Sequence, residues 1–314
     1  MPTTSLLSLT FTELLANQTR PPLTVANPES TVASALLSLK KLDRLCLPLA
    51  SHTGRKRVVA VVSTSDILAY IVRTSGVSGK GDGKLHPDRV DLTQPIDRVL
   101  PLESDEESYR FWERDYRDTI ETTLIAFARG VHRALITDAL DERPPALLTQ
   151  TDVLRYVHAN MSCVPPSVSL DAPISSILPS AARKLVTMAA DESAISGLIR
   201  IRESKIAALP VVNTSGSVVA NLSVSDLRGV TSVELYNLNS PVIEYLKSLS
   251  PNGNPKSLNP IVVTPQDSMR SVLNILVEKH IHRVWVVASA DDRRPIGVVS
   301  QSDVIATFAG VSVP

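Results

Sequence analysis

A short polar motif that occurs four times carries the chemistry most strongly suggested by this sequence. Each copy has the pattern hydroxyl-x-hydroxyl-Asp, follows a β-branched apolar run and precedes apolar residues at helical spacing. The copies recur at intervals of roughly 80 residues, which indicates one supersecondary unit used four times. These Asp motifs are Ser63-Thr64-Ser65-Asp66, Thr149-Gln150-Thr151-Asp152, Ser223-Val224-Ser225-Asp226 and Ser300-Gln301-Ser302-Asp303.

Two compatible interpretations of the Asp motif follow from its residue types. In the first it is a capping box, in which the first hydroxyl accepts the N–H three residues on and the carboxylate reaches back. In the second it is a ligand site, because the free N–H groups of a helix start attract an anion and the carboxylate can accept both hydroxyls of a ribose. The carboxylate would repel a phosphate, so phosphates should point away from Asp toward basic residues.

The basic residues that could meet a phosphate are unevenly distributed. His132-Arg133 and His282-Arg283 lead into predicted strands of repeats 2 and 4, whereas repeat 3 has Ala207-Ala208 there and repeat 1 offers Arg44. A guanidinium fork suits phosphate oxygens, and a neighbouring imidazole can add a donor. The competing interpretation is that these are surface residues at strand starts.

Other kinds of site find little support in the sequence. His280-Ile281-His282 places two imidazoles on one face of an extended segment, but a zinc site needs further ligands that are not evident, so no metal is predicted. No nucleophile elbow, cysteine nucleophile motif or carboxylate cluster is found. We therefore expect no enzyme, the alternative being a catalytic site assembled across repeats.

The elements that must position the Asp motifs form a repeated series. Each unit is predicted to contain a short leading segment, an amphipathic helix, two apolar strands, the Asp motif and a second helix. Near-continuous apolar strands favour a sheet covered on both faces. The plausible N-caps of the first helices are Ser30, Asp118, Asp191 and Asp267. The predicted strands are 45–49 and 58–62, 134–137 and 146–148, 208–212 and 218–222, and 284–287 and 296–299.

Composition narrows the classes of function. The chain of 314 residues has 32 Lys and Arg against 32 Asp and Glu, so no long-range attraction for nucleic acid or an acidic membrane is expected. Its aromatic content of 4% argues against stacking on single-stranded nucleic acid. Cys46 and Cys163 lie in different repeats, and neither a signal peptide nor a membrane-spanning apolar run is apparent. These features predict a cytoplasmic location, with a nuclear one also open.

The repeated unit resembles the CBS domain. The resemblance rests on Val131-His132-Arg133, Ile281-His282-Arg283, Ala208-Leu209-Pro210-Val211-Val212 and the four Asp motifs. Two such repeats resemble a Bateman module, and four in one chain are similar to the γ regulatory subunit of AMP-activated and SNF1-type protein kinases. The resemblance implies an α/β (α+β) fold of four CBS repeats, paired into two Bateman modules that form a flattened pseudo-symmetric disc. The expected boundaries are 1–73 for repeat 1, 74–91 for a flexible linker, 92–160 for repeat 2, 161–232 for repeat 3 and 233–314 for repeat 4.

The resemblance also implies ligands and the residues that bind them. AMP, ADP or ATP would lie in clefts between paired repeats, with Asp on the ribose and hydroxyls and His-Arg pairs on the phosphates. One γ-like repeat commonly lacks the Asp, but Asp152 is present here, and Gln150 and Thr151 stand where Lys or Arg is often found. The implied nucleotide-binding residues are Asp66, Asp152, Asp226, Asp303, Ser63, Ser65, Thr149, Thr151, Ser223, Ser225, Ser300, Ser302, Arg44, His132, Arg133, His282 and Arg283.

The functional hypothesis is a non-catalytic adenine-nucleotide-binding regulatory protein that acts on a protein kinase. Its expected partners are Ser/Thr kinase catalytic and scaffold subunits, or a further copy of itself through CBS modules. Two alternatives stay open. One is a stand-alone CBS scaffold in which the capping boxes are only structural. The other is a Bateman protein that binds a different adenosyl ligand, such as S-adenosylmethionine or a dinucleotide.

Overall fold

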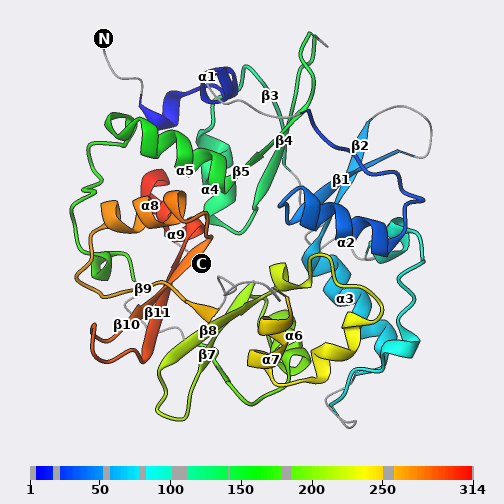
Figure 1. Ribbon diagram of the computed structural model, residues 1–314. Helices are drawn as coiled ribbons and strands as arrows, with labels where there is room; N and C mark the ends of the chain where they lie inside the picture. The colour runs from blue at the N-terminus through cyan, green and yellow to red at the C-terminus, as the bar shows by residue number, and fades with distance from the viewer. Residues whose placement is uncertain are drawn as a thin grey trace. The chain divides into compact units, whose positions relative to one another are not determined.

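Four small sheets with flanking helices make up the α/β fold of the computed structural model (Figure 1). The structure describes residues 5–16, 22–51, 57–77, 83–100, 112–140, 142–178, 185–249 and 258–312. The sheet orders are β1-β2, β3-β4-β5, β6-β7-β8 and β11-β10-β9. One sheet falls in each predicted repeat, which confirms the fourfold use of one unit.

The two predicted strands of every repeat are present within a residue or two of the expected positions and pair antiparallel. The first strands are buried along most of their length, as near-continuous apolar runs predict. The first strands are β1 Cys46–Ala50, β4 Arg133–Thr137, β7 Ala208–Val212 and β10 Arg283–Val287. The second strands are β2 Val58–Ser63, β5 Ala146–Thr149, β8 Val218–Ser223 and β11 Pro295–Ser300.

Each repeat also has a short parallel pairing that the sequence did not reveal. In repeats 2, 3 and 4 the strands β3 (Trp112–Asp115), β6 (Met188–Ala189) and β9 (Val262–Val263) pair parallel with the first strand. In repeat 1 a single parallel bridge joins Ala26 to Leu49. A parallel pair needs a crossover, which the first helix supplies. Segments this short have too few residues to show a period of two.

The amphipathic helices follow the predicted order, with one exception. The first helices are α2 Val32–Lys41, α4 Glu121–Ala128, α6 Ala194–Glu203 and α8 Met269–Glu278. The second helices are α3 Thr64–Ser75, α5 Gln150–Ala159 and α9 Gln301–Ala309. The prediction of a second helix in repeat 3 was wrong, because only the 3-10 helix η7 (Val224–Leu227) forms there.

Gly229 accounts for the early end of η7. Its φ of 75° is left-handed, and its N–H donates to the carbonyl of Leu36 on α2. This φ strains any residue with a Cβ, and a Cβ at this position would also displace the side chain of Lys40, whose Cδ would lie 2.2 Å away. The backbone therefore turns onto α2 instead of continuing as a helix.

The predicted N-caps were displaced from the observed ones. The caps are Thr31, Ser193 and Ser268, each accepting the N–H three residues on, and α4 starts after Ile120 without a side-chain cap. The carboxylates of Asp118 and Asp267 instead accept the N–H of Asp115 and Thr264 in the preceding turn. Ser30 and Asp191 likewise lie before the caps. Asp, Ser and Thr are all favourable N-cap residues, so the sequence alone does not show which of several neighbouring candidates caps the helix.

The leading segment of each repeat packs on the neighbouring repeat in sequence. The chain of η1 (Leu6–Ser8) and α1 (Phe11–Ala16) bridges repeat 2 through Thr10 and Thr119, while η3 (Ile96–Val99) follows a bridge between Pro95 and Thr31 of repeat 1. In the same way η6 (Ile174–Ser176) follows a Pro173–Ser268 bridge to repeat 4, and α7 (Val242–Ser248) follows a Pro241–Ser193 bridge to repeat 3. The expected boundaries between repeats stay a prediction.

The stretch expected to be a linker is packed where the structure describes it. Around η2 (Pro87–Arg89), Leu85 and Val90 are buried, and Leu85 exchanges two hydrogen bonds with the side chain of Asn239. Residues 78–82 of this stretch lie outside the described residues, as do the acidic segment 103–108 and most of the insert 251–260.

The chain divides into two compact units that pair repeats which are not consecutive. Unit 1 comprises Met1–Leu23, Phe111–Leu185 and Ile261–Pro314, and so holds repeats 2 and 4. Unit 2 comprises Thr24–Arg110 and Val186–Pro260, and so holds repeats 1 and 3. Each unit has its own continuous apolar core. No helix in the described part of the chain is long and apolar enough to cross a bilayer.

Candidate functional site

All four Asp motifs form capping boxes, as the first interpretation predicts. In each, Oδ2 of the aspartate accepts the backbone N–H of the first motif residue, at 2.7 Å for Asp66, 2.8 Å for Asp152, and 2.7 Å for Asp226 and Asp303. A carboxylate offers about four lone-pair positions on two oxygens. The cap therefore fixes the carboxylate at the start of the helix.

The four carboxylates differ in their access to solvent. Asp66 is only 2% exposed, and Ser63 and Thr64 beside it are equally buried. Asp152, Asp226 and Asp303 are partly exposed. A ligand could reach these three carboxylates directly, whereas repeat 1 would have to open first.

The strand registers bring the predicted arginines of unit 1 to the Asp motifs. Arg133 lies opposite Thr149 in the β4–β5 pair, and Arg283 lies opposite Ser300 in the β10–β11 pair. Antiparallel partners of this kind have Cα atoms about 4.5–5.5 Å apart. The side chain of each arginine therefore begins beside the first hydroxyl residue of its motif. The histidines that precede the arginines, His132 and His282, are exposed.

Unit 2 has no basic residue at the equivalent position. There Cys46 lies opposite Ser63, and Ala208 lies opposite Ser223. The residue three places before each strand start has a positive φ, of 49° at Asp43, 52° at Lys205, 53° at His280 and 96° at Gly130. In this shared turn Lys205 occupies the position of His280. Arg44, which is exposed, lies two places before Cys46, the residue that occupies the position of Arg133 in repeat 1. The strand register therefore does not support the predicted role of Arg44 in binding.

The second hydroxyls of the two unit 1 motifs face each other's repeat. Gln150 Nε2 donates to Ser302 Oγ at 2.9 Å, and Gln301 Nε2 donates to Thr151 Oγ1 at 3.0 Å. Gln150 also donates to the carbonyl of Phe127 at 3.0 Å. Gln150 is 7% exposed and Gln301 is 4% exposed. We call the two reciprocal contacts, Gln150 with Ser302 and Gln301 with Thr151, the Gln pair.

The Gln pair changes how the predicted site residues are interpreted. Thr151 and Ser302 were expected to meet phosphates, but their hydroxyls already take part in a contact between repeats 2 and 4. A phosphate would need the proton of the hydroxyl, and Thr151 already donates its proton to Gln301 Oε1 at 3.2 Å. The available signal in the sequence was glutamine at the second position of only these two motifs, and of the two glutamines only Gln150 was interpreted, as a departure from the family pattern.

The repeat 3 motif is held differently. Ser223 Oγ accepts the N–H of Ser225, and its hydroxyl lies against that of Ser225. The backbone carbonyl of Asp226 accepts the hydroxyl of Tyr245 at 2.7 Å. Burial raises the pKa of Tyr245 well above its usual value, so this phenol stays protonated and donates. The motif therefore ends in a fixed turn, with Ser223 and Ser225 bonded to each other.

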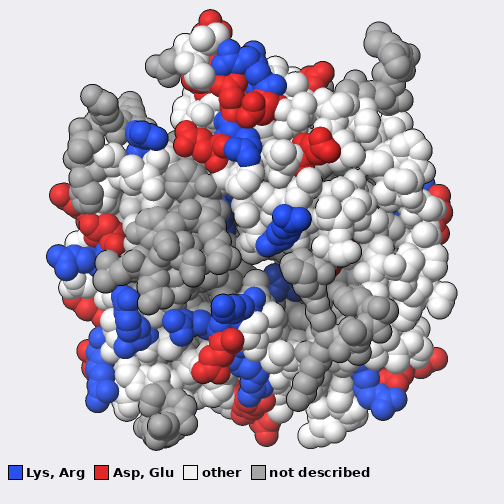
Figure 2. Space-filling view, turned by 180° about the vertical axis from the view of Figure 1, so that it is seen from behind, with Lys and Arg blue, Asp and Glu red and all other residues white. Residues whose placement is uncertain are grey.

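The described residues support neither a metal site nor a strong electrostatic field of one sign on the face shown in Figure 2. His280 Nδ1 lies 3.3 Å from an Arg155 guanidinium nitrogen, and no group of three His, Cys, Asp or Glu side chains in the described ranges could hold a metal ion. Acidic and basic side chains are intermingled on the face shown in Figure 2. Burial also raises the pKa of Cys163 to about 11, which keeps this thiol protonated at neutral pH.

Comparison with sequence families shows what the C-terminal repeat is. Residues 256–310 match the model of the CBS domain. Protein SDS23 of Candida albicans is 26% identical over 216 residues, which cover 66% of this chain and 33% of that protein. Protein SDS23 of Saccharomyces cerevisiae is 23% identical over 281 residues, which cover 84% of this chain and 53% of that protein. The chain thus spans between a third and about half of the length of these curated relatives.

Solved structures show the fold of the whole chain. Protein MJ1225 from Methanocaldococcus jannaschii, described as a suggested archaeal homologue of g-AMPK, aligns with a TM-score of 0.67 and 17% identity over 96% of this chain and 100% of that one. An uncharacterized conserved protein from Pyrococcus horikoshii aligns with a TM-score of 0.53 and 16% identity over 92% and 96%. Residues 256–310 therefore match a CBS domain, and the chain as a whole has the α/β fold of MJ1225, with one similar unit in each of the four repeats.

Proposed function

We propose that this chain is a non-catalytic regulatory protein that binds an adenine nucleotide, AMP, ADP or ATP, at the Asp motifs of repeats 2 and 4. The observation that carries the proposal is the register of unit 1, which sets Arg133 opposite Thr149 and Arg283 opposite Ser300. A partly exposed carboxylate and a guanidinium thereby flank one helix start in each repeat.

The chemistry of binding follows from the opposite charges of these two groups. Asp152 or Asp303 accepts ribose hydroxyls, and the phosphates turn toward Arg133 or Arg283, with His132 or His282 as an additional donor. A charge-assisted hydrogen bond contributes about 1.5–3 kcal/mol. Micromolar affinity corresponds to about 8 kcal/mol, which two or three such bonds and a buried adenine would supply.

Repeats 1 and 3 are proposed to be weaker sites. Asp66 is buried and its strand starts with Cys46, while Asp226 has Ala208 in the place of the arginine. Their remaining hydroxyls, Ser63, Ser65, Ser223 and Ser225, and Arg44 are proposed to contribute at most secondary contacts. Binding is therefore expected to have a stoichiometry nearer two than four.

The regulated partner is proposed to be a Ser/Thr protein kinase, through its catalytic and scaffold subunits. The support is the likeness in fold to a suggested homologue of g-AMPK. Regulation requires that the nucleotide bind two states of the protein with different affinities. Co-purification of a kinase subunit with the chain, sensitive to added AMP or ATP, would test this part.

A scaffold without nucleotide sensing is the second candidate, and the four complete capping boxes favour it. Calorimetric titration of AMP, ADP and ATP separates the two, with Asp303→Ala and Arg283→Ala as variants. The proposal expects both variants to weaken binding, by tenfold or more. A scaffold expects no heat with any adenylate, and a lower melting temperature for Asp303→Ala as its only effect.

A further inference from the structure

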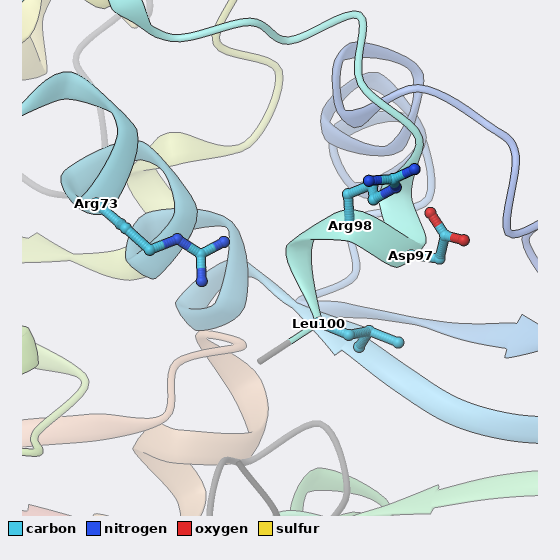
Figure 3. Close-up of a pocket in the computed structure, with 4 residues that line it drawn as sticks. All are labelled: Arg73, Asp97, Arg98 and Leu100. Atoms are coloured by element: carbon cyan, nitrogen blue, oxygen red, sulfur yellow. The ribbon is translucent and has the colours of Figure 1, made fainter. Parts of the chain in front are cut away.

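A cavity of about 380 Å³ lies in unit 2. Among the described residues it is lined by Arg73, Asp97, Arg98 and Leu100 (Figure 3). Arg73 reaches from the last turn of α3 toward η3, which carries Asp97 and Arg98. A volume of this size falls in the range of small-molecule pockets.

One wall of this cavity forms because the leading segment of repeat 2 packs on repeat 1. The segment before repeat 2 lies on repeat 1, where the N–H of Ile96 donates to the carbonyl of Ser30 at 2.7 Å and that of Asp97 to the carbonyl of Pro28 at 3.3 Å. Ile96 and Val99 are buried beneath it. Because one side of η3 is anchored in this way, Asp97 and Arg98 are presented from a fixed support.

The opposite wall is equally anchored. Ile67 and Ile71 of α3 are fully buried, and the helix ends at Gly76, whose φ is 72°. The guanidinium of Arg89 packs where a Cβ of Gly76 would stand, at 2.7 Å from Nη1. The favourable field at a helix C-terminus explains a cation at Arg73. It does not explain why Arg98, from another segment, lines the same cavity.

We propose that this cavity binds a phosphorylated small molecule that also carries hydroxyl groups. Each guanidinium can donate two parallel N–H bonds to phosphate oxygens, and Arg73 and Arg98 bring two such groups to the cavity wall from different elements. The carboxylate of Asp97 would repel a phosphate but accepts hydrogen bonds from hydroxyls. Leu100 offers an apolar surface to the carbon skeleton. We therefore expect the ligand to place its phosphate against the wall that carries these arginines and a hydroxyl on Asp97.

This site is independent of the proposed nucleotide sites, because it uses no residue of an Asp motif or of a strand start. The same chemistry could come from a sugar phosphate or from the ribose phosphate of a nucleotide. The experiment therefore titrates the full chain with ribose 5-phosphate, AMP, inorganic phosphate and ribose in parallel, by calorimetry. Arg283→Ala serves as a background in which the proposed nucleotide site of repeat 4 is weakened.

The expected result is that ribose 5-phosphate binds more tightly than inorganic phosphate and that ribose alone binds least. Arg73→Gln and Arg98→Gln should each weaken ribose 5-phosphate at least tenfold, both in the wild-type protein and in the Arg283→Ala background. The matched control is Arg202→Gln, an exposed arginine in the last turn of α6, which shares the helix-end position of Arg73 but lines no part of this cavity. Binding of AMP that is lost in Arg98→Gln would identify a nucleotide as the source of the ribose phosphate.

Asp97→Asn tests the proposed hydroxyl contact separately from the proposed phosphate contact. It should weaken ribose 5-phosphate, because a hydroxyl acceptor is altered, and tighten inorganic phosphate, because a negative charge is removed. Wild-type protein that binds neither phosphate at millimolar concentration would overturn the site. So would unchanged affinities in Arg73→Gln and Arg98→Gln variants whose melting temperatures match the wild type. Equal affinity for phosphate and ribose 5-phosphate would overturn the hydroxyl-bearing ligand.

Discussion

Unit 1 and unit 2 contain the same secondary-structure plan and the same capping boxes, yet they differ in the residues around each box. In unit 1 both first strands start with arginine, and both motifs carry a buried glutamine that reaches the other repeat. In unit 2 the strands start with Cys46 and Ala208, and the second motif positions are Thr64 and Val224.

This difference separates what the fold needs from what a ligand needs. A capping box satisfies backbone groups at a helix start and is required wherever the strand-to-helix turn is used. The arginines and the Gln pair are not needed for that turn, since unit 2 forms it without them. The four motifs are therefore equivalent as caps, and the residues around them distinguish the proposed sites.

The largest expected effect is the loss of nucleotide binding when the unit 1 arginine of repeat 2 is removed. Arg133→Ala should weaken AMP or ATP by roughly tenfold to a hundredfold, because one or more charge-assisted bonds of about 1.5–3 kcal/mol are lost. Arg133 is 7% exposed, so circular dichroism must confirm that the variant folds. Calorimetry or fluorescence titration measures the affinity.

Arg44→Ala supplies the matched comparison in unit 2. Arg44 is exposed and lies two places before the aligned strand start, so its removal should leave the affinity within about twofold. Equal losses in Arg44→Ala and Arg133→Ala would contradict the division between the units. It would show that repeat 1 is a site of comparable strength.

The next effect concerns the contact between repeats 2 and 4. Gln150→Leu leaves Ser302 and the carbonyl of Phe127 without their amide donor, and we expect a loss of about 1–3 kcal/mol in the free energy of unfolding. Gln301→Leu should behave alike. The double variant should lose less than the two single losses together, because the four residues form one network. Urea denaturation followed by circular dichroism measures these values.

Thr64→Val is the control for the single and double glutamine variants. It changes the second motif position in repeat 1 of unit 2 to valine, the residue that repeat 3 has there as Val224. It should cost well under 1 kcal/mol. Strictly additive losses in the glutamine variants would mean that the reciprocal hydrogen bonds do not act as a pair.

Much of this architecture could be predicted because each feature had a local signal. The Asp motifs marked the end of the second strand of every repeat and the start of a helix in three of them, and strand positions followed from apolar runs. The exchange of leading segments and the pairing of repeats 1 with 3 and 2 with 4 had none. Those features depend on which apolar faces meet in space, and all four repeats present similar faces.

The candidate site was predictable to the same extent. The first motif residue and Asp lie where the pattern placed them, whereas the roles of Thr151 and Ser302 depended on a partner about 150 residues away. Arg44 lies two places before the strand position of Arg133, and this register could not be counted from the sequence alone because the start of the strand in repeat 1 has no His-Arg pair to mark it. The failed helix in repeat 3 had a visible cause in Gly229, whose significance needed the contact with Lys40.

The smallest expected effect tests whether the two units share that turn despite their different chemistry. At Gly130 in unit 1 the φ is 96° and a Cβ would meet nothing within 4 Å, so Gly130→Ala should destabilise through the backbone alone, by about 1–2 kcal/mol. At Lys205 in unit 2 the φ of 52° already carries that strain. Lys205→Gly should relieve it, but the greater freedom of glycine in the unfolded chain offsets most of the gain, which leaves a few tenths of a kcal/mol of stabilisation. Thermal melting of both variants gives opposite signs if the turn is shared. The same sign in both would mean that the turns of units 1 and 2 are not equivalent, and the alignment that sets Arg133 against Cys46 and Ala208 would fail with them.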